Sequence, residues 1–154
     1  MSATLISSAG PDNIGTLVDL MAGFHAESGY SLDRRAAALA FQRLLANPQL
    51  GGVWLASVGN DTAGYVVLTQ RYSMDHGAFT AHIEDLYVKP ACRRSGVASA
   101  LLSALMEDCR RRACKSVQVE VGHDNTSAVA LYQRFGLAPF TDGRILLHGL
   151  ARSS

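Results

Sequence analysis

A short basic turn follows a strand-like apolar run, and this combination can bind phosphate groups. Residues 83–88 form the run, Arg93 and Arg94 supply positive charge, and Gly96 stands just before an apolar helical pattern. Glycine lets the backbone approach a ligand closely, and the first amides of the following helix have no partner within it and attract anions. The sequence therefore predicts a diphosphate site where this turn enters the helix.

Two polar side chains of the preceding strand are candidates for proton transfer. Side chains alternate along a strand, so we expect His82 and Glu84 on one face and Asp85 on the other. A carboxylate or an imidazole can accept a proton from a ligand, so either residue can act as a general base. The alternative is that Glu84 is an exposed strand residue that forms a cross-strand ion pair.

A later helical segment carries the third candidate, Tyr132. It shares one helical stripe with Ala128, Leu131 and Phe135, which is the pattern of an aromatic residue packed in the core. A phenol with a pKa near 10 can also stabilise developing negative charge through a hydrogen bond. Asn125, where the segment begins, is a typical helix N-cap. The residues alone leave both interpretations of Tyr132 open.

Hydrophobic periodicity predicts the elements that must position these side chains. Alternating or continuous apolar runs indicate strands, and apolar residues three and four apart indicate helices. We expect a mixed α/β fold with about 6–7 strands and about four helices, in which a strand, a helix and a parallel strand form a βαβ core. The expected strands are residues 4–8, 53–58, 63–69, 82–88, 117–121, 137–140 and 145–150, and the expected helices are 11–24, 32–46, 96–113 and one that follows Asn125.

Length and composition indicate one enzyme-sized domain, residues 1–154. The balance of 14 basic and 13 acidic side chains, a net charge of +1, gives no reason to expect nucleic acid as a partner. Three cysteines without a Cys-x-x-Cys pair indicate neither a disulfide framework nor a metal site, and they suit a reducing cytoplasm. No stretch approaches the roughly 20 apolar residues of a membrane span. We therefore expect a cytoplasmic protein with no metal and no membrane partner.

Two motifs resemble those of one enzyme family. The spacing Arg93-x-x-Gly96-x-Ala98 resembles the acyl-CoA pyrophosphate loop of the GNAT (GCN5-related) N-acetyltransferase superfamily. Residues 125–137 resemble the family motif Asn-x-x-Ala-x-x-Leu-Tyr-x-x-x-Gly-Phe, with Leu137 in place of the phenylalanine. The resemblance covers roughly residues 3–150 and is strongest between 80 and 140.

The resemblance implies acetyl-CoA as the cosubstrate and assigns the residues that bind it. In the family two central strands splay apart and admit the pantetheine arm, and here these strands are residues 82–88 and 117–121. The Leu86 amide is implied to polarise the thioester carbonyl, and the Val88 backbone to hold the pantetheine arm. The full set of implied acetyl-CoA-binding residues is Leu86, Tyr87, Val88, Arg93, Arg94, Ser95, Gly96, Val97, Ala98, Ser99, Asn125 and Ala128.

The resemblance also implies direct transfer of the acetyl group to a primary amine in a ternary complex. A free alkylamine has a pKa of about 10.4, which leaves only about one molecule in a thousand neutral at pH 7, so the reaction needs a base. Glu84 stands where the family often has the residue that accepts the amine proton, directly or through water, and His82 lies one pleat away. The matching tyrosine of the family, here Tyr132, serves the departing thiolate as general acid. The sequence does not decide whether Glu84, His82 or water is the base.

The acceptor is expected to be a small-molecule amine. Family members shape the acceptor site with the first two helices and the loop before the active strand; the candidates that follow here are Phe24, His25, Glu27, Tyr30, Tyr72, Asp75 and His76. His82, on the active strand itself, is a further candidate. The alternatives are a protein lysine or N-terminal acetyltransferase, or a catalytically silent acyl-CoA-binding regulatory module. GNAT domains often pair through their last strands, so the resemblance is compatible with a homodimer, but the sequence contains no decisive interface.

Overall fold

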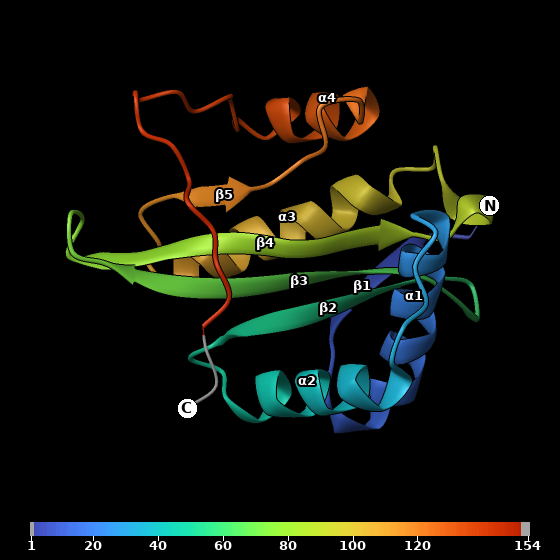
Figure 1. The fold of residues 1–154 in the computed structure, drawn as a ribbon. Helices are drawn as coiled ribbons and strands as arrows, with labels where there is room; N and C mark the ends of the chain where they lie inside the picture. Colours follow the sequence, from blue (N-terminus) through green and yellow to red (C-terminus); the bar gives the residue numbers. More distant parts are fainter. Residues whose placement is uncertain (1, 152–154) are drawn as a thin grey trace. The chain divides into compact units, whose positions relative to one another are not determined.

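The computed structural model describes residues 2–151 and contains a mixed sheet with helices on both faces (Figure 1). The chain divides into two compact units, residues 1–120 and 121–154. The first unit contains β1 (Thr4–Ser8), α1 (Ile14–Glu27), α2 (Arg34–Ala46), β2 (Gly51–Val58), β3 (Asp61–Ser73), β4 (Ala78–Val88), α3 (Val97–Arg111) and β5 (Val117–Val119), with short 3₁₀ turns at Pro11–Asn13 and Pro90–Cys92; the second contains α4 (Thr126–Arg134).

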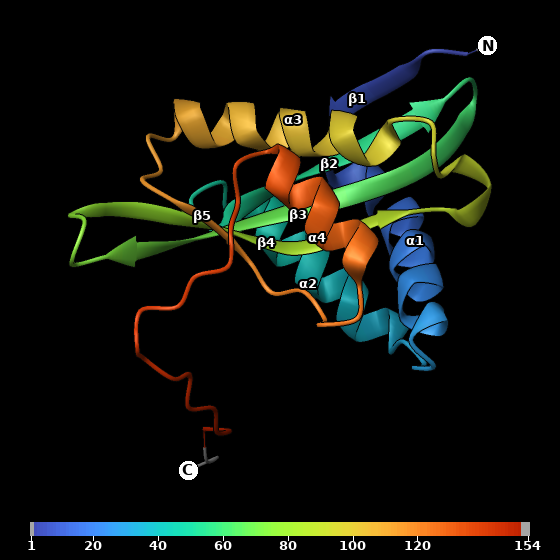
Figure 2. The same cartoon turned by 90° about the horizontal axis from the view of Figure 1, so that it is seen from above.

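The five strands lie in the order β1-β2-β3-β4-β5. The first four pair antiparallel with their neighbours in sequence, whereas β5 pairs parallel to β4. A parallel neighbour needs a crossover, which α3 provides between β4 and β5 (Figure 2). The predicted α/β class and the predicted βαβ core are therefore confirmed.

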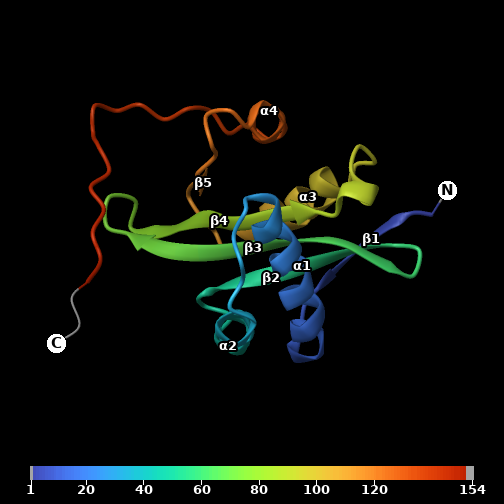
Figure 3. The same ribbon diagram turned by 45° about the vertical axis from the view of Figure 1, so that its right-hand side comes forward.

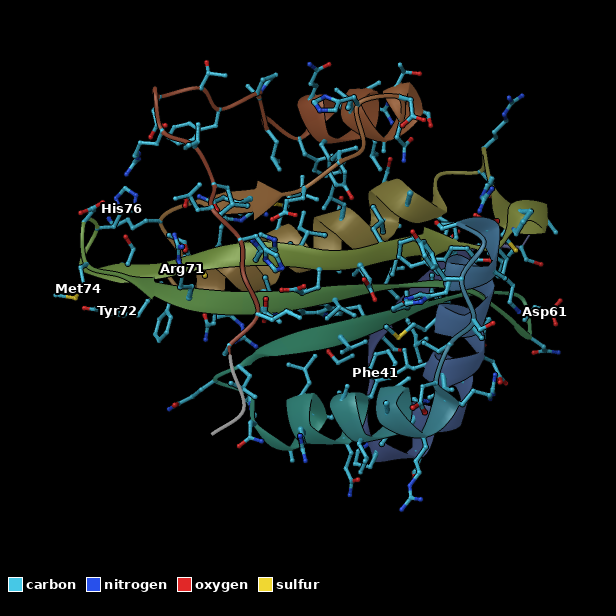
Figure 4. The ribbon with its side chains drawn as sticks, viewed as in Figure 1. Phe41, Asp61, Arg71, Tyr72, Met74 and His76 are labelled. Atoms are coloured by element: carbon cyan, nitrogen blue, oxygen red, sulfur yellow. The ribbon has the colours of Figure 1, made fainter. Side chains whose placement is uncertain are left out.

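Helices α1 and α2 cover one face of this sheet, and α3 covers the other (Figure 3). On the α1–α2 face, Leu17 and Phe41 pack with Tyr65, Val67 and other side chains of β2, β3 and β4 into one buried cluster. Phe41 lies between α2 and the sheet in Figure 4. From Tyr65 to Thr69, the residues of β3 with odd numbers belong to this face, because side chains alternate along a strand.

The amphipathic stripe of α3 explains why this helix crosses the opposite face. Its buried side chains are spaced one, three or four residues apart, so they lie on one side of the helix: Val97, Leu101, Leu102, Leu105 and Cys109. The basic end of the helix is held by Arg112, which donates to Asp108 and to the carbonyls of Pro48 and Gly51. The α3 helix is therefore attached to the sheet along its length and at its end.

The second unit differs from the sequence prediction after α4. Residues 137–140 and 145–150 were expected as strands, but within the described part of the chain they form none, so the sheet has five strands and not six or seven. Only the turn between them exists, with Gly143 at φ 82° and the Arg144 amide donating to Asp142. A strand needs a hydrogen-bonded neighbour, and apolar sequence alone does not supply one. Phe140, Ile145, Leu146, Leu147 and Leu150 are exposed as a result.

Gly64 allows β3 and β4 to approach each other where β4 ends. A Cβ atom on Gly64 would lie 2.3 Å from the Tyr87 carbonyl oxygen and 3.1 Å from the Val88 Cα. Both neighbours are backbone atoms, so they cannot rotate away as a side chain would. The geometry of the last residues of β4 therefore depends on the missing side chain at Gly64.

Substituting Gly64→Ala should destabilise the protein. The added methyl group must push β3 and β4 apart, and such overpacking costs about 1–3 kcal/mol of the free energy of unfolding. Urea unfolding monitored by circular dichroism measures the loss. The matched control is Gly15→Ala in α1, where nothing lies within 4 Å of the new Cβ; it should stabilise the helix by about 0.5–1 kcal/mol. Equal stability of the two variants would contradict the close approach.

Candidate active site

An extra residue interrupts the pairing of β4 with β3. Val67 of β3 faces Asp85, but the next residue, Leu68, faces Ile83, so Glu84 has no partner of its own. Such a β-bulge bends the strand and changes the direction of the side chains around it. Glu84, the predicted base, is the inserted residue.

The bulge places two neighbouring carboxylates on the same face of the sheet. Thr69 Oγ1 donates to Glu84 Oε1 over 2.7 Å, and the Tyr65 hydroxyl donates to Asp85 Oδ2 over 2.9 Å. Thr69 and Tyr65 are four residues apart on β3 and therefore point to the same face, the one covered by α1 and α2. The expectation that Asp85 lies on the opposite face is wrong, because alternation fails at a bulge.

The two carboxylates differ in their surroundings. Glu84 is exposed, whereas Asp85 is partly buried. Burial raises the pKa of Asp85 above its ordinary value and the adjacent Glu84 charge adds to the rise, while the hydrogen bond from Tyr65 and the nearby His25 oppose it. Burial and the Asp85 charge also raise the pKa of Tyr65, so this phenol stays protonated as a donor. Of the pair, Glu84 is the carboxylate that a ligand can reach from solvent.

The outer edge of β4 is unpaired beyond the bulge. Pairing with β5 ends at Ile83 and Val119 within the described residues. The Lys89 amide donates to the Ala63 carbonyl, toward β3. Because amides alternate in direction along a strand, those of Leu86 and Val88 point to the free edge. This geometry fits the implied role of these two amides as partners of an acyl-CoA arm.

The turn that follows β4 presents unpaired amides at the start of α3. Arg94 has φ 62° and Gly96 has φ 83°, two left-handed residues that reverse the chain. The first helical bond runs from the Ala100 amide to the Gly96 carbonyl, 3.0 Å away. The preceding amides, those of Val97, Ala98 and Ser99, are left at the positive end of the helix dipole. They suit a diphosphate.

Other residues of this turn have partners within the protein. Ser95 Oγ donates to the Cys92 carbonyl over 2.7 Å and thereby closes the turn. Arg93 binds the Glu27 carboxylate and the Val88 carbonyl. The side chain of Tyr87 is buried. The predicted roles of these residues toward acetyl-CoA stay predictions.

In the second unit, Asn125 caps α4 as its sequence position indicated. Its Oδ1 accepts a hydrogen bond from the Ala128 amide over 3.2 Å. Tyr132 is buried, and burial raises its pKa to about 12. The phenol is therefore protonated at every pH at which an acetyltransferase is normally assayed.

The acceptor candidates do not form one cluster. His82 is partly buried opposite Thr69, on the same face as Glu84. Tyr30 is exposed in the loop after α1. Tyr72 and His76 lie at the tip of the β3–β4 hairpin (Figure 4), at the other end of β4 from Val88.

Sequence reasoning missed Thr69 and Tyr65, the β3 partners of the two carboxylates. A signal was present, because Glu84 and Asp85 are consecutive charged residues within a half-buried strand. Regular alternation would place the two carboxylates on opposite faces of the sheet, and a bulge is the irregularity that brings both to one face, where Tyr65 and Thr69 donate to them.

The described residues hold no group of three or more His, Cys, Asp or Glu side chains arranged to bind a metal ion. Among the helices of residues 2–151, none is long and apolar enough to cross a membrane.

Comparison with known proteins identifies the sequence family. The sequence profile of the Acetyltransferase (GNAT) family matches residues 17–137. The thialysine N-epsilon-acetyltransferase of Caenorhabditis elegans is 34% identical over 79 residues, which are 51% of this chain and 49% of that protein. The chain thus spans about half the length of this curated relative.

Solved structures share the fold over nearly the whole chain. An integron cassette protein from the mobile metagenome of Cole Harbour Salt Marsh has a TM-score of 0.85 and 31% identity, over 97% of this chain and 91% of that one. A predicted acetyltransferase from Clostridium acetobutylicum, solved with acetyl-CoA, has a TM-score of 0.79 and 18% identity, over 95% and 96%. The matched residues and the shared fold lead to one conclusion: this chain belongs to the acetyltransferase (GNAT) family, whose members are acyltransferases.

Proposed function

We propose that this protein transfers an acetyl group from acetyl-CoA to a primary amine of a small molecule, by direct transfer in a ternary complex. The observation that carries the proposal is the bulge at Glu84. It exposes a carboxylate on the same strand whose outer edge is unpaired from that residue onward. Neighbouring residues of β4 would therefore supply both the base and the edge that binds the acyl donor.

Acetyl-CoA supplies the acetyl group as an activated thioester. The chain would hold it with the amides at the start of α3 on the diphosphate and with the free edge of β4 along the pantetheine arm. The Leu86 amide points to this edge and can donate to the thioester carbonyl. Preorganised donors of this kind stabilise the oxyanion that develops during acyl transfer.

Glu84 accepts the proton that the acceptor ammonium must lose, directly or through a water molecule. Its exposure lets it meet an amine, and its hydrogen bond from Thr69 fixes the carboxylate while leaving the second oxygen available. General base catalysis typically contributes about 10²–10⁴ in rate. His82 lies on the same face and is the alternative base.

Tyr132 provides the hydroxyl for the departing thiolate. A thiol has a pKa of about 8.5, well below the value of about 12 to which burial raises the pKa of Tyr132. Complete proton transfer from phenol to thiolate is therefore uphill, and the hydroxyl acts chiefly by donating a hydrogen bond to the developing negative charge.

The acceptor class rests on charge and on one relative. The carboxylates of Glu84 and Asp85 favour a cationic amine on the α1–α2 face, and the C. elegans relative is named for an N-epsilon amine.

Protein acetylation and silent acyl-CoA binding are the competing functions. A panel of free amino acids, polyamines, aminoglycosides and peptides, offered with acetyl-CoA, separates them when release of free thiol is followed. Release with small amines supports the proposal; release with peptides alone, or binding without any release, contradicts it.

Glu84→Gln should lower kcat by about 10²–10⁴ with little change in the KM for acetyl-CoA, because the amide cannot accept the amine proton. Steady-state thiol release measures the loss across pH. Glu107→Gln is the control, since this exposed carboxylate pairs with Arg110 at the far end of α3 and its loss should leave activity unchanged. If His82→Gln loses the activity that Glu84→Gln retains, His82 is the base.

Tyr132→Phe should lower kcat by about tenfold or more while acetyl-CoA binding is retained, because only the hydroxyl is removed. Since burial raises the pKa of Tyr132 to about 12, the hydroxyl stays protonated below that pH. The loss should therefore be the same factor at every assay pH, and the shape of the pH profile should not change. An unchanged kcat would show that Tyr132 serves only the core.

A further inference from the structure

The guanidinium of Arg93 contacts three residues of the first unit. Its Nη2 donates to Glu27 Oε1 over 2.6 Å and to Oε2 over 2.7 Å, at the end of α1. Its Nε donates to the Val88 carbonyl over 2.9 Å, at the end of β4. Its Cζ lies 5.8 Å from the centroid of the Tyr87 ring. The side chain of Arg93 thus pairs with a carboxylate of α1 and lies against the end of β4.

The end of α1 fits closely around this arrangement. Tyr87 stacks on Phe24, with ring centroids 5.5 Å apart and planes 12° apart. Gly23 leaves room for the Tyr87 hydroxyl, which would lie 2.9 Å from a Cβ at that position. Figure 1 shows this end of α1 beside the tip of the β4 arrow. Glu27 therefore extends a packed contact between α1 and β4 out to the loop.

Arg94, the next residue, is in a different situation. It has φ 62° and is exposed. With the residues described by the structure it forms neither a hydrogen bond nor an ion pair. Of these two adjacent arginines, Arg93 already has a carboxylate partner, whereas Arg94 has none among the described residues.

We propose that Glu27 is a positioning residue for the acetyl-CoA loop, which it holds through Arg93, and that Arg94, not Arg93, supplies the charged side chain for the diphosphate. This inference rests on the proposed function. A diphosphate that recruited Arg93 would have to compete with a carboxylate that already contacts Nη2 through both oxygens. The pair is exposed, so this competition has the modest size of a surface ion pair. Arg94 has no such competitor.

The anchor, defined as Glu27 and Arg93, acts through the backbone. The bond from Arg93 to the Val88 carbonyl closes the chain around the Pro90–Cys92 turn and sets its entry into α3. Glu27 ties this closed turn to α1. Loss of the anchor should loosen the Val88 corner and the first amides of α3 together, and thus affect the pantetheine arm as well as the diphosphate.

The test compares kcat/KM for acetyl-CoA and for S-acetylpantetheine, which lacks the diphosphate. It is done at high ionic strength, where long-range attraction is screened. Glu27→Gln and Arg93→Gln should lower both values by the same factor, about two- to fivefold, and the double variant should be no worse than Arg93→Gln. Arg93→Lys should behave like Arg93→Gln, because a single ammonium cannot replace the guanidinium fork. Arg94→Gln should lower only the value for acetyl-CoA.

A second measurement uses the protein without any ligand. Amide hydrogen exchange in residues 89–99 should be faster in Glu27→Gln than in the wild type. Asp19→Asn is the matched control, because Asp19 also lies on α1 and pairs with an exposed arginine, Arg34, away from the loop. Its exchange in residues 89–99 should equal that of the wild type.

Two results would overturn the anchor. One is a gain in affinity for acetyl-CoA alone in Glu27→Gln, which would mean that the carboxylate competes with the diphosphate for Arg93. The other is unchanged exchange in residues 89–99. Hydrogen exchange needs neither acetyl-CoA nor an acceptor, so it tests the anchor even if the amine panel refutes the proposed function. A wild-type protein that fails to bind acetyl-CoA would overturn that function and, with it, the role of Arg94.

Discussion

The single extra residue in β4 is the constraint on which the rest of the site depends. Before Glu84, odd-numbered residues of the strand turn their amides toward β5, as Ala81 does. After Glu84 this parity is reversed, so Leu86 and Val88 face the same edge at a point where β5 no longer pairs. The same insertion brings two consecutive carboxylates to one face. One irregularity thus determines which amides face the free edge and leaves one of the two carboxylates exposed.

Local patterns were enough to predict most of the fold. The first strand, Thr4–Ser8, has the bounds expected from its sequence, and the stripe of α3 was recognisable from apolar spacing. The βαβ core followed because a helix between two apolar runs allows few arrangements. Asn125 was recognisable as an N-cap for the same reason: the interaction it makes is with a residue only three positions away.

The features that were missed depend on contacts between distant residues or on the absence of a partner. A bulge is set by the register of two strands, and nothing in residues 82–88 taken alone states which residue is skipped. Glu27 and Arg93 are separated by 66 positions, so their pairing had no sequence signal. The segments 137–140 and 145–150 have strand-like composition, but hydrogen-bonded neighbours decide whether a strand forms.

The bond from Arg93 to the Val88 carbonyl limits the hydrogen-bonding groups that the free edge of β4 offers to a ligand. Within a strand, the amide and the carbonyl of one residue point the same way, so Leu86 offers a donor and then an acceptor. Val88 adds a donor, but its carbonyl is already satisfied. An extended molecule that lies along this edge therefore meets a donor, an acceptor and a donor, and it must present an acceptor, a donor and an acceptor to pair with all three.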